Sequence, residues 1–297
     1  MQLKKLKTER PNLTSTNLDM MSALDIAALM NREDAIVPRA IKRVLPGVAR
    51  AIDIIAQRLA KGGRLIYVGT GTSGRIGALD AVEIPPTFGI DRRKIQFVIA
   101  GGEKALARAT EASEDSSALG RLDMAATKPG KNDVVVGIAA SGRTPYTIGA
   151  LEYAIKKGAA IIAVVCNKGS AMANMADVAI EVDVGPEVLT GSTRLKAGTA
   201  EKLICNMLST GAMVRLGYVY GNLMVNLQLK NHKLSERGIS IVEEVAHVDR
   251  ETALRALKSA EMKVPVALVM LKAKVSKMEA IRRLKKTHGV VREALKG

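Results

Sequence analysis

The chain has 297 residues, 47% of them hydrophobic, and carries a formal net charge of +16. This length is enough for one large core with a small additional unit. No apolar run approaches the roughly 20 residues that cross a bilayer, and the polar N-terminus lacks the apolar stretch of a signal peptide. We therefore expect a cytoplasmic protein with no membrane segment.

Cysteine content and charge distribution argue against a disulfide-linked, a zinc-binding and a nucleic-acid-binding protein. Cys166 and Cys205 lie in apolar patterns and form no C-x-x-C pair, so we expect buried thiols, no disulfide and no zinc site. The positive charge would suit a nucleic-acid-binding protein, but half of the excess lies in residues 249–297. A solvated basic C-terminal segment explains that distribution better, and we expect no nucleic-acid partner.

Helices and strands are predicted to alternate. Apolar residues at helical spacing predict helices over Leu18–Met30 and Val37–Leu59. Five β-rich runs follow, most of them continuously apolar, as strands buried on both faces require. The runs are Arg64–Gly69, Ile95–Ala100, Asp133–Ala139, Ala159–Val165 and Val178–Val182. Helical stretches between them, including Lys104–Ala126 with a break and Pro145–Lys157, predict an α/β fold with a doubly wound parallel sheet.

The last third of the chain is predicted to be helical. Thr193–Leu216 is apolar around most of its circumference, which is typical of a buried helix. Beyond His247, short basic amphipathic segments predict a three-helix module with a terminal extension. We expect a helical lead over 1–60, a sheet domain with the long helix over 61–248, and the helical module over 249–297.

A loop rich in glycine and hydroxyl groups follows the first predicted strand. Residues 69–74 read GTGTSG, contain Thr72 and Ser73, and satisfy the pattern G-x-G-x-x-G. A dinucleotide site would also want an acidic residue where the second strand ends, and Glu103 comes late for that role. Hydroxyls and free N–H groups at a helix N-terminus suit a compact phosphate better than a pyrophosphate.

Two further segments have the same character. Ser141, Gly142 and Thr144 follow the third predicted strand and stand directly before a helix. Ordinary N-capping, worth about 1 kcal/mol, explains either loop alone. Because two loops at neighbouring strand ends would converge, the pair favours a phosphate ligand. A third segment, around Ser192, opens the long helix, and capping is the alternative there too.

Carboxylates are the acid–base candidates, since the three histidines all lie outside the predicted sheet. Glu83 ends the helix that the first loop opens, and Pro85-Pro86 is expected to stop that helix at once. Glu114 lies in the predicted helix after the second strand, within the acidic cluster Glu111–Asp115. Composition alone would leave both glutamates as solvated side chains.

Three segments resemble one protein family, both in their residues and in their order along the chain: Gly69–Gly89, Gly137–Ala154 and Gly185–Lys202. They closely resemble N-acetylmuramic acid 6-phosphate etherases. The resemblance runs from Ala23 to Asn231, and the C-terminal helices look like the UBA-like (ubiquitin-associated-like) module of that family. It implies a sugar isomerase (SIS) fold with a five-stranded sheet, and we expect a homodimer with the site near the subunit boundary.

The resemblance implies a reaction as well as a fold. The family cleaves the D-lactyl ether of N-acetylmuramic acid 6-phosphate to N-acetylglucosamine 6-phosphate and D-lactate, in cell-wall recycling. The ether at C3 lies β to the aldehyde of the opened sugar, so elimination and water addition need a base at C2 and an acid at the lactate oxygen, without metal or cofactor. Glu83 and Glu114 match the family's catalytic pair. The resemblance leaves open which is acid and which is base; our hypothesis is that Glu83 is the acid that releases lactate and then the base that activates water, with Glu114 as the base at C2.

The same resemblance assigns phosphate binding to Ser73, Ser141 and Thr144, with Thr72 and Gly142 as neighbours. One departure is Ile84, where the family commonly has cysteine. A sugar-phosphate sensor such as the glucokinase regulator shares these loops but binds without reacting, and retention of both glutamates argues against it. A nucleic-acid-binding regulator would need a recognition helix in residues 1–60, which show none.

Overall fold

A single parallel sheet organises the computed structural model, which describes residues 6–108, 113–229 and 231–297. The strand order is β2-β1-β3-β4-β5, with every pair parallel. The strands are β1 (Leu65–Gly69), β2 (Ile95–Ile99), β3 (Val134–Ala139), β4 (Ala160–Val165) and β5 (Val178–Glu181). Strands β1, β3 and β4 are buried at every position, as a sheet covered on both faces requires. The predicted five-stranded parallel sheet is confirmed.

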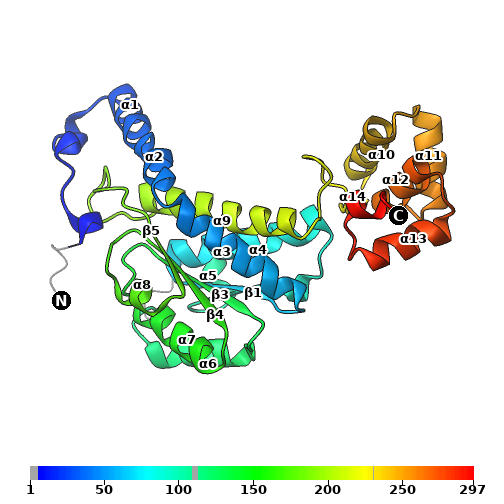
Figure 1. Ribbon diagram of the computed structural model, residues 1–297. Coiled ribbons are helices and arrows are strands. Elements are labelled where there is room, and N and C mark those ends of the chain that lie inside the picture. The colour runs from blue at the N-terminus through cyan, green and yellow to red at the C-terminus, as the bar shows by residue number, and fades with distance from the viewer. Residues whose placement is uncertain (1–5, 109–112, 230) are drawn as a thin grey trace. The chain divides into compact units, whose positions relative to one another are not determined.

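Helices cover both faces of this sheet (Figure 1). On one side lie α6 (Ser117–Ala126), α7 (Pro145–Lys156) and the short α8 (Ala171–Met175). On the other lie α3 (Leu45–Ala60), α4 (Gly71–Phe88) and α9 (Lys196–Arg215). The strand order reverses between β1 and β3, and in open α/β sheets ligands bind beside such a reversal, outside the carboxyl ends of the strands.

The helices before the sheet differ from the prediction. Leu18–Met20 forms a 3₁₀ turn, and α1 (Ala23–Asp34) begins only after Ser22, whose hydroxyl oxygen accepts the Asp25 amide. A single helix over Val37–Leu59 is wrong, because α2 (Ile36–Lys42) ends before α3 begins. Pro46 stands in the first turn of α3, where its missing N–H costs no hydrogen bond, so the break falls just ahead of it.

The expected stop of α4 at Pro85-Pro86 is also wrong, because the helix continues to Phe88. Ile84 and Phe88 are both buried and lie one helical turn apart, which fixes the last turn. The Thr87 hydroxyl donates to the carbonyl of Glu83 at 2.7 Å. Burial of the apolar side chains therefore outweighs the amide hydrogen bonds that the two prolines remove.

The predicted break within Lys104–Ala126 is confirmed. Helix α5 (Lys104–Ala107) is a single turn, and α6 begins after Ser116, whose hydroxyl oxygen accepts the Leu119 amide at 3.1 Å. Residues 109–112 of this stretch, including Glu111 of the acidic cluster, lie outside the described residues.

The chain divides into two compact units, each with its own core. The described residues of Met1–Val82 and Arg93–Ser209 form the first; Glu83–Arg92 and Thr210–Gly297 form the second. The second contains α10 (His232–Ala246), α11 (Arg250–Ser259), α12 (Val264–Ala273), α13 (Lys277–Lys286) and α14 (Val291–Ala294). Its core is built around α12, where Val266, Leu268 and Val269 are buried. The predicted helical C-terminal region is confirmed.

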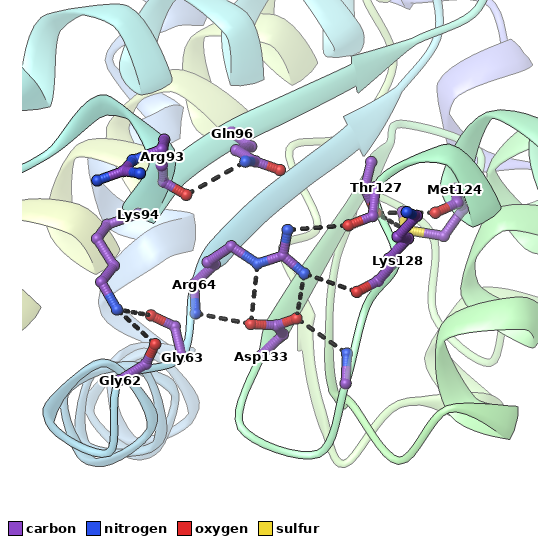
Figure 2. Close-up of polar contacts among 11 residues, drawn as sticks. Gly62, Gly63, Arg64, Arg93, Lys94, Gln96, Met124, Thr127, Lys128 and Asp133 are labelled. Carbon is purple, nitrogen blue, oxygen red and sulfur yellow. Dashed lines mark hydrogen bonds and ion pairs between the residues drawn. The ribbon is translucent and has the colours of Figure 1, made fainter.

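An ion pair joins the amino ends of β1 and β3 (Figure 2). Arg64 Nη2 lies 2.6 Å from Asp133 Oδ2, and the Arg64 amide donates to Oδ1 at 2.8 Å. The same guanidinium donates to the carbonyls of Thr127 and Lys128 at 2.9 Å each. Burial opposes ionisation of Asp133, but the bonds from Arg64 outweigh it and lower its pKa below the ordinary value. This network lies at the edge of the sheet opposite the two predicted hydroxyl-rich loops, which follow the carboxyl ends of β1 and β3.

Both cysteines are buried and free, as expected. Burial raises the pKa of each thiol, and neighbouring carboxylates add to the effect. Within the described ranges, three or more His, Cys, Asp or Glu side chains nowhere group as metal ligands would. No helix in that part of the chain is both long and apolar enough to cross a bilayer.

Candidate active site at the carboxyl edge of the sheet

The first hydroxyl loop connects β1 to α4. Gly71, the first residue of α4, has a φ of +49°, a left-handed conformation that glycine adopts without strain. The first-turn amides of a helix have no partner within the helix, so the start of α4 places such donors directly after β1. Thr72 packs against the start of α9, since a Cβ placed on Gly198 would lie 3.4 Å from Thr72 Cγ2.

The second loop connects β3 to α7. Gly142 has a φ of +65°, and a Cβ there would lie 2.2 Å from the Ser170 hydroxyl oxygen, so only glycine fits. The Ser141 hydroxyl oxygen accepts the Arg143 amide at 3.2 Å, a local turn bond. Thr144 is the N-cap residue of α7, yet its side chain makes no capping hydrogen bond. Simple N-capping therefore does not account for the Thr144 hydroxyl.

Glu114 connects the two loops. Its carbonyl accepts the amide of Tyr146, in the first turn of α7, at 3.0 Å. Its carboxylate reaches the first loop, because a Cβ placed on Gly71 would lie 3.1 Å from Glu114 Oε1. The prediction that Glu114 lies in a helix is wrong: it stands in the turn before α6, half-buried. A turn allows its backbone to cap one helix while its side chain points at another.

Glu83 is exposed near the end of α4 and belongs to the second compact unit. Glu114 and both hydroxyl loops belong to the first. The pairing of Glu83 with Glu114 stays a prediction.

Sequence reasoning missed Glu201. The Ser73 hydroxyl donates to Glu201 Oε1 at 2.9 Å, across from α4 to the second turn of α9. Glu201 is 1% exposed, and this burial raises its pKa to about 8; the bond from Ser73 lowers the pKa and Glu187 raises it further. A carboxylate inside a helix predicted to be buried was the available signal. Its partner was not visible in the sequence.

Full-length relatives decide the family. The N-acetylmuramic acid 6-phosphate etherase of Burkholderia lata is 53% identical over 295 residues, covering 99% of this chain and 97% of the relative. The etherase of Klebsiella aerogenes is 51% identical over 99% of this chain and 98% of its own length; that of Clostridium beijerinckii is 48% identical over 99% and 97%. This chain belongs to the N-acetylmuramic acid 6-phosphate etherase family.

Domain-family models and solved structures show an SIS fold. The glucokinase regulatory protein N-terminal SIS domain matches residues 47–155, and the SIS domain matches residues 106–210. A phosphoheptose isomerase from Francisella tularensis superposes with a TM-score of 0.53 at 21% identity, covering 65% of this chain and all of its own. A phosphosugar isomerase from Bacteroides fragilis, described as putative, gives 0.52 at 19%, covering 73% and 97%. These two structures support the fold alone.

In this etherase-family chain, Glu187 caps the long helix α9. The sequence had left helix capping as the alternative role for the segment around Ser192. Its carboxylate accepts the amides of Lys196 and Ala197 at 2.9 Å each, and burial raises its pKa. Ser192 lies in the preceding turn, its carbonyl accepting the Leu195 amide at 3.2 Å. Helix capping at α9 therefore belongs to Glu187, and substrate binding by Ser192 stays a prediction.

The N-terminal lead of the etherase-family chain reaches the same sheet edge, which the sequence did not indicate. Asn167, just after β4, accepts the Lys7 amide at 3.0 Å and donates to the Thr8 hydroxyl at 3.1 Å. A Cβ on Gly191 would lie 3.2 Å from Glu9 Oε2, so the lead also lies beside the segment before α9. Figure 1 shows the blue lead next to this yellow-green segment.

A buried ion pair fixes that arrangement. Lys196 Nζ donates to Glu33 Oε2 at 2.6 Å, and the Lys196 side chain is 1% exposed. Asn12 Nδ2 donates to the same carboxylate oxygen at 2.9 Å. Burial opposes ionisation of Glu33, but the bonds from Lys196 and Asn12 outweigh it and lower its pKa.

Proposed function

We propose that this chain cleaves the D-lactyl ether of N-acetylmuramic acid 6-phosphate, giving N-acetylglucosamine 6-phosphate and D-lactate, in the recycling of cell-wall sugars in the cytoplasm. The full-length relatives named for this activity, 48–53% identical, support it. The observation that carries the proposal is the position of Glu114, which contacts both hydroxyl loops at once. A base held there would face a sugar whose phosphate occupies the loops.

In the proposed reaction Ser73, Ser141 and Thr144 bind the phosphate, with Thr72, Gly142 and Ser192 as neighbouring contacts. The Glu114 carboxylate removes the C2 proton of the opened sugar, whose aldehyde acidifies it. The C–H electron pair forms the C2–C3 double bond while the C3–O bond breaks, and Glu83 protonates the departing lactate oxygen. Water then adds at C3, and C2 regains a proton.

Two further parts of the proposal are a reaction without metal or cofactor and a homodimeric assembly. Because the aldehyde already stabilises charge at C2, the elimination requires no metal or cofactor. We also infer a homodimer with the site near the subunit boundary. Leu79 and Val82 of α4 are 51% and 54% exposed, and a second subunit would cover such apolar side chains. Sedimentation of the purified protein measures the oligomeric state.

One observation favours a second candidate function. The match to the glucokinase regulatory protein domain over residues 47–155 fits a sensor that binds sugar phosphates without reacting. Release of D-lactate from N-acetylmuramic acid 6-phosphate, measured with EDTA present and with Glu83→Ala as the control, separates the two. Release that survives EDTA and is lost in the variant supports a metal-free etherase. A folded protein that binds the substrate and releases no lactate supports the sensor.

A further inference from the structure

The Ser73 hydroxyl has one proton, and two acceptors compete for it, the Glu201 carboxylate and a bound phosphate. In this structure it donates that proton to Glu201 Oε1 at 2.9 Å. A phosphate dianion offers only acceptor oxygens, so it also needs a donor from Ser73. A serine that donates to a carboxylate presents only lone pairs to a phosphate, which would repel it. Phosphate binding through Ser73 therefore requires a change at Glu201.

The surroundings of Glu201 favour its neutral form. The groups that interact with it are Ser73 on α4, Glu187 ahead of α9, Cys166 after β4, and Cys205 one turn further along α9. None of these four is a cation, and both thiols have raised pKa values and stay neutral. A carboxylate that is 1% exposed and lacks a positive partner among these groups is costly to keep ionised.

We infer that Glu201 is a positioning residue that binds phosphate ligands in its acid form, donating its proton to Ser73 Oγ so that Ser73 donates to the phosphate. This inference rests on the proposed function only in taking the first loop as the phosphate site. Apart from the O–H bond formed when an ionised Glu201 is protonated, only hydrogen bonds change. When Glu201 is ionised in the free protein, binding takes up one proton from solution; when it is already protonated, binding takes up none.

A pH dependence follows from this proton balance. The pKa of Glu201 is raised to about 8 by burial. Affinity for the phosphate dianion is therefore nearly constant at pH values well below 8 and falls as Glu201 ionises. The dissociation constant should be about tenfold larger at pH 9 than at pH 7. The phosphate of a sugar phosphate, with a second pKa of about 6, is already about nine-tenths dianion at pH 7 and changes little above it.

Calorimetric titration with N-acetylglucosamine 6-phosphate tests the inference between pH 7 and 9.5. Inorganic phosphate serves as a second probe only from pH 8.5 upward, because its own second ionisation falls near neutral pH. Two buffers of different ionisation enthalpy report proton uptake, expected at about three-quarters of a proton at pH 8.5. Glu201→Gln keeps a donor toward Ser73, so it should bind as tightly as wild type at pH 7 and lose both the affinity change and the proton uptake. Asp80→Asn is the matched control. Asp80 is also buried with a raised pKa, but it accepts from Tyr67 and Ser209, so this variant should keep both effects.

Each outcome bears on the inference. An affinity fall above pH 8 that persists in Glu201→Gln, or wild-type binding without proton uptake at pH 8.5, would overturn it and leave the etherase proposal untouched. Binding of neither probe at any pH would overturn the inference together with the phosphate site. Lactate release, measured separately, tests the reaction. If Glu201→Gln fails to fold, the wild-type proton uptake still decides.

Discussion

The backbone carbonyl of Glu114 accepts the amide of Tyr146 at 3.0 Å, while its carboxylate lies beside Gly71 of the other hydroxyl loop. One residue thus contacts the loops that follow two neighbouring strands. Because β1 and β3 are adjacent, with Gly69 beside Ile138, any ligand bound by both loops lies within reach of Glu114.

Glu114→Gln should abolish proton abstraction while leaving the loops intact, because the amide keeps the size of the carboxyl but is not a base. We expect kcat to fall on the order of 10²- to 10⁴-fold, with little change in the affinity for N-acetylglucosamine 6-phosphate. Deuterium exchange at C2 in heavy water should disappear with it. C2 exchange at the wild-type rate would exclude Glu114 as the base.

Glu83→Ala should separate the two halves of the reaction. If Glu83 protonates the lactate oxygen, the variant still exchanges the C2 proton with solvent. Its rate of lactate release should fall by a factor on the order of 10² or more. Proton magnetic resonance in heavy water follows both signals in one sample. Unchanged lactate release would remove Glu83 from the mechanism.

Ser141→Ala should weaken substrate binding more than turnover. The Ser141 hydroxyl is assigned to the phosphate, which does not react, so the loss falls mainly on KM, by roughly tenfold. Ser116→Ala is a suitable control, because its hydroxyl caps α6 and has no assigned role in binding. That variant should lose about 1 kcal/mol of unfolding free energy and keep KM. A fall in kcat alone for Ser141→Ala would argue against the assignment.

Gly142→Ala and Gly169→Ala form a pair that separates strain from crowding. Their φ angles are similar, +65° and +62°, so each alanine costs about 1 kcal/mol in backbone strain. Only the Gly142 Cβ meets another atom, Ser170 Oγ at 2.2 Å; at Gly169 nothing lies within 4 Å. Thermal unfolding should show Gly142→Ala clearly less stable than Gly169→Ala. Equal stabilities would mean that the second loop shifts without cost.

Asp133→Asn should make stability less dependent on acid pH. The folded-state pKa of Asp133 is lowered, so its ion pair with Arg64 stabilises the fold above the unfolded pKa of about 3.9 and is lost as pH falls through the lower folded value. At pH 7 we expect the variant to lose about 2 kcal/mol of unfolding free energy. Urea titrations should show the difference shrinking below pH 4. A constant difference down to pH 2 would contradict the assignment.

Several features were readable because their signals are local. Continuous apolar runs such as Val134–Ala139 marked the buried strands, and each strand lies within one residue of its predicted bounds. Glycines with hydroxyls directly after a strand marked both loops. Burial overrode local signals in one place, where Ile84 and Phe88 carry α4 past two prolines that were expected to end it.

The sequence by itself determined the strand pattern, the two loops and the family. Each of these depends on residues that are close together along the chain. Tertiary structure alone decided which distant side chains meet. Ser73 and Glu201 are 128 positions apart, and Lys7 and Asn167 are 160 apart. Such contacts depend on strand order and helix packing, which bring segments together whose residues carry no mutual signal along the chain. The pKa of Glu201 depends on those contacts in turn, because the surroundings of a buried carboxyl group set its ionisation.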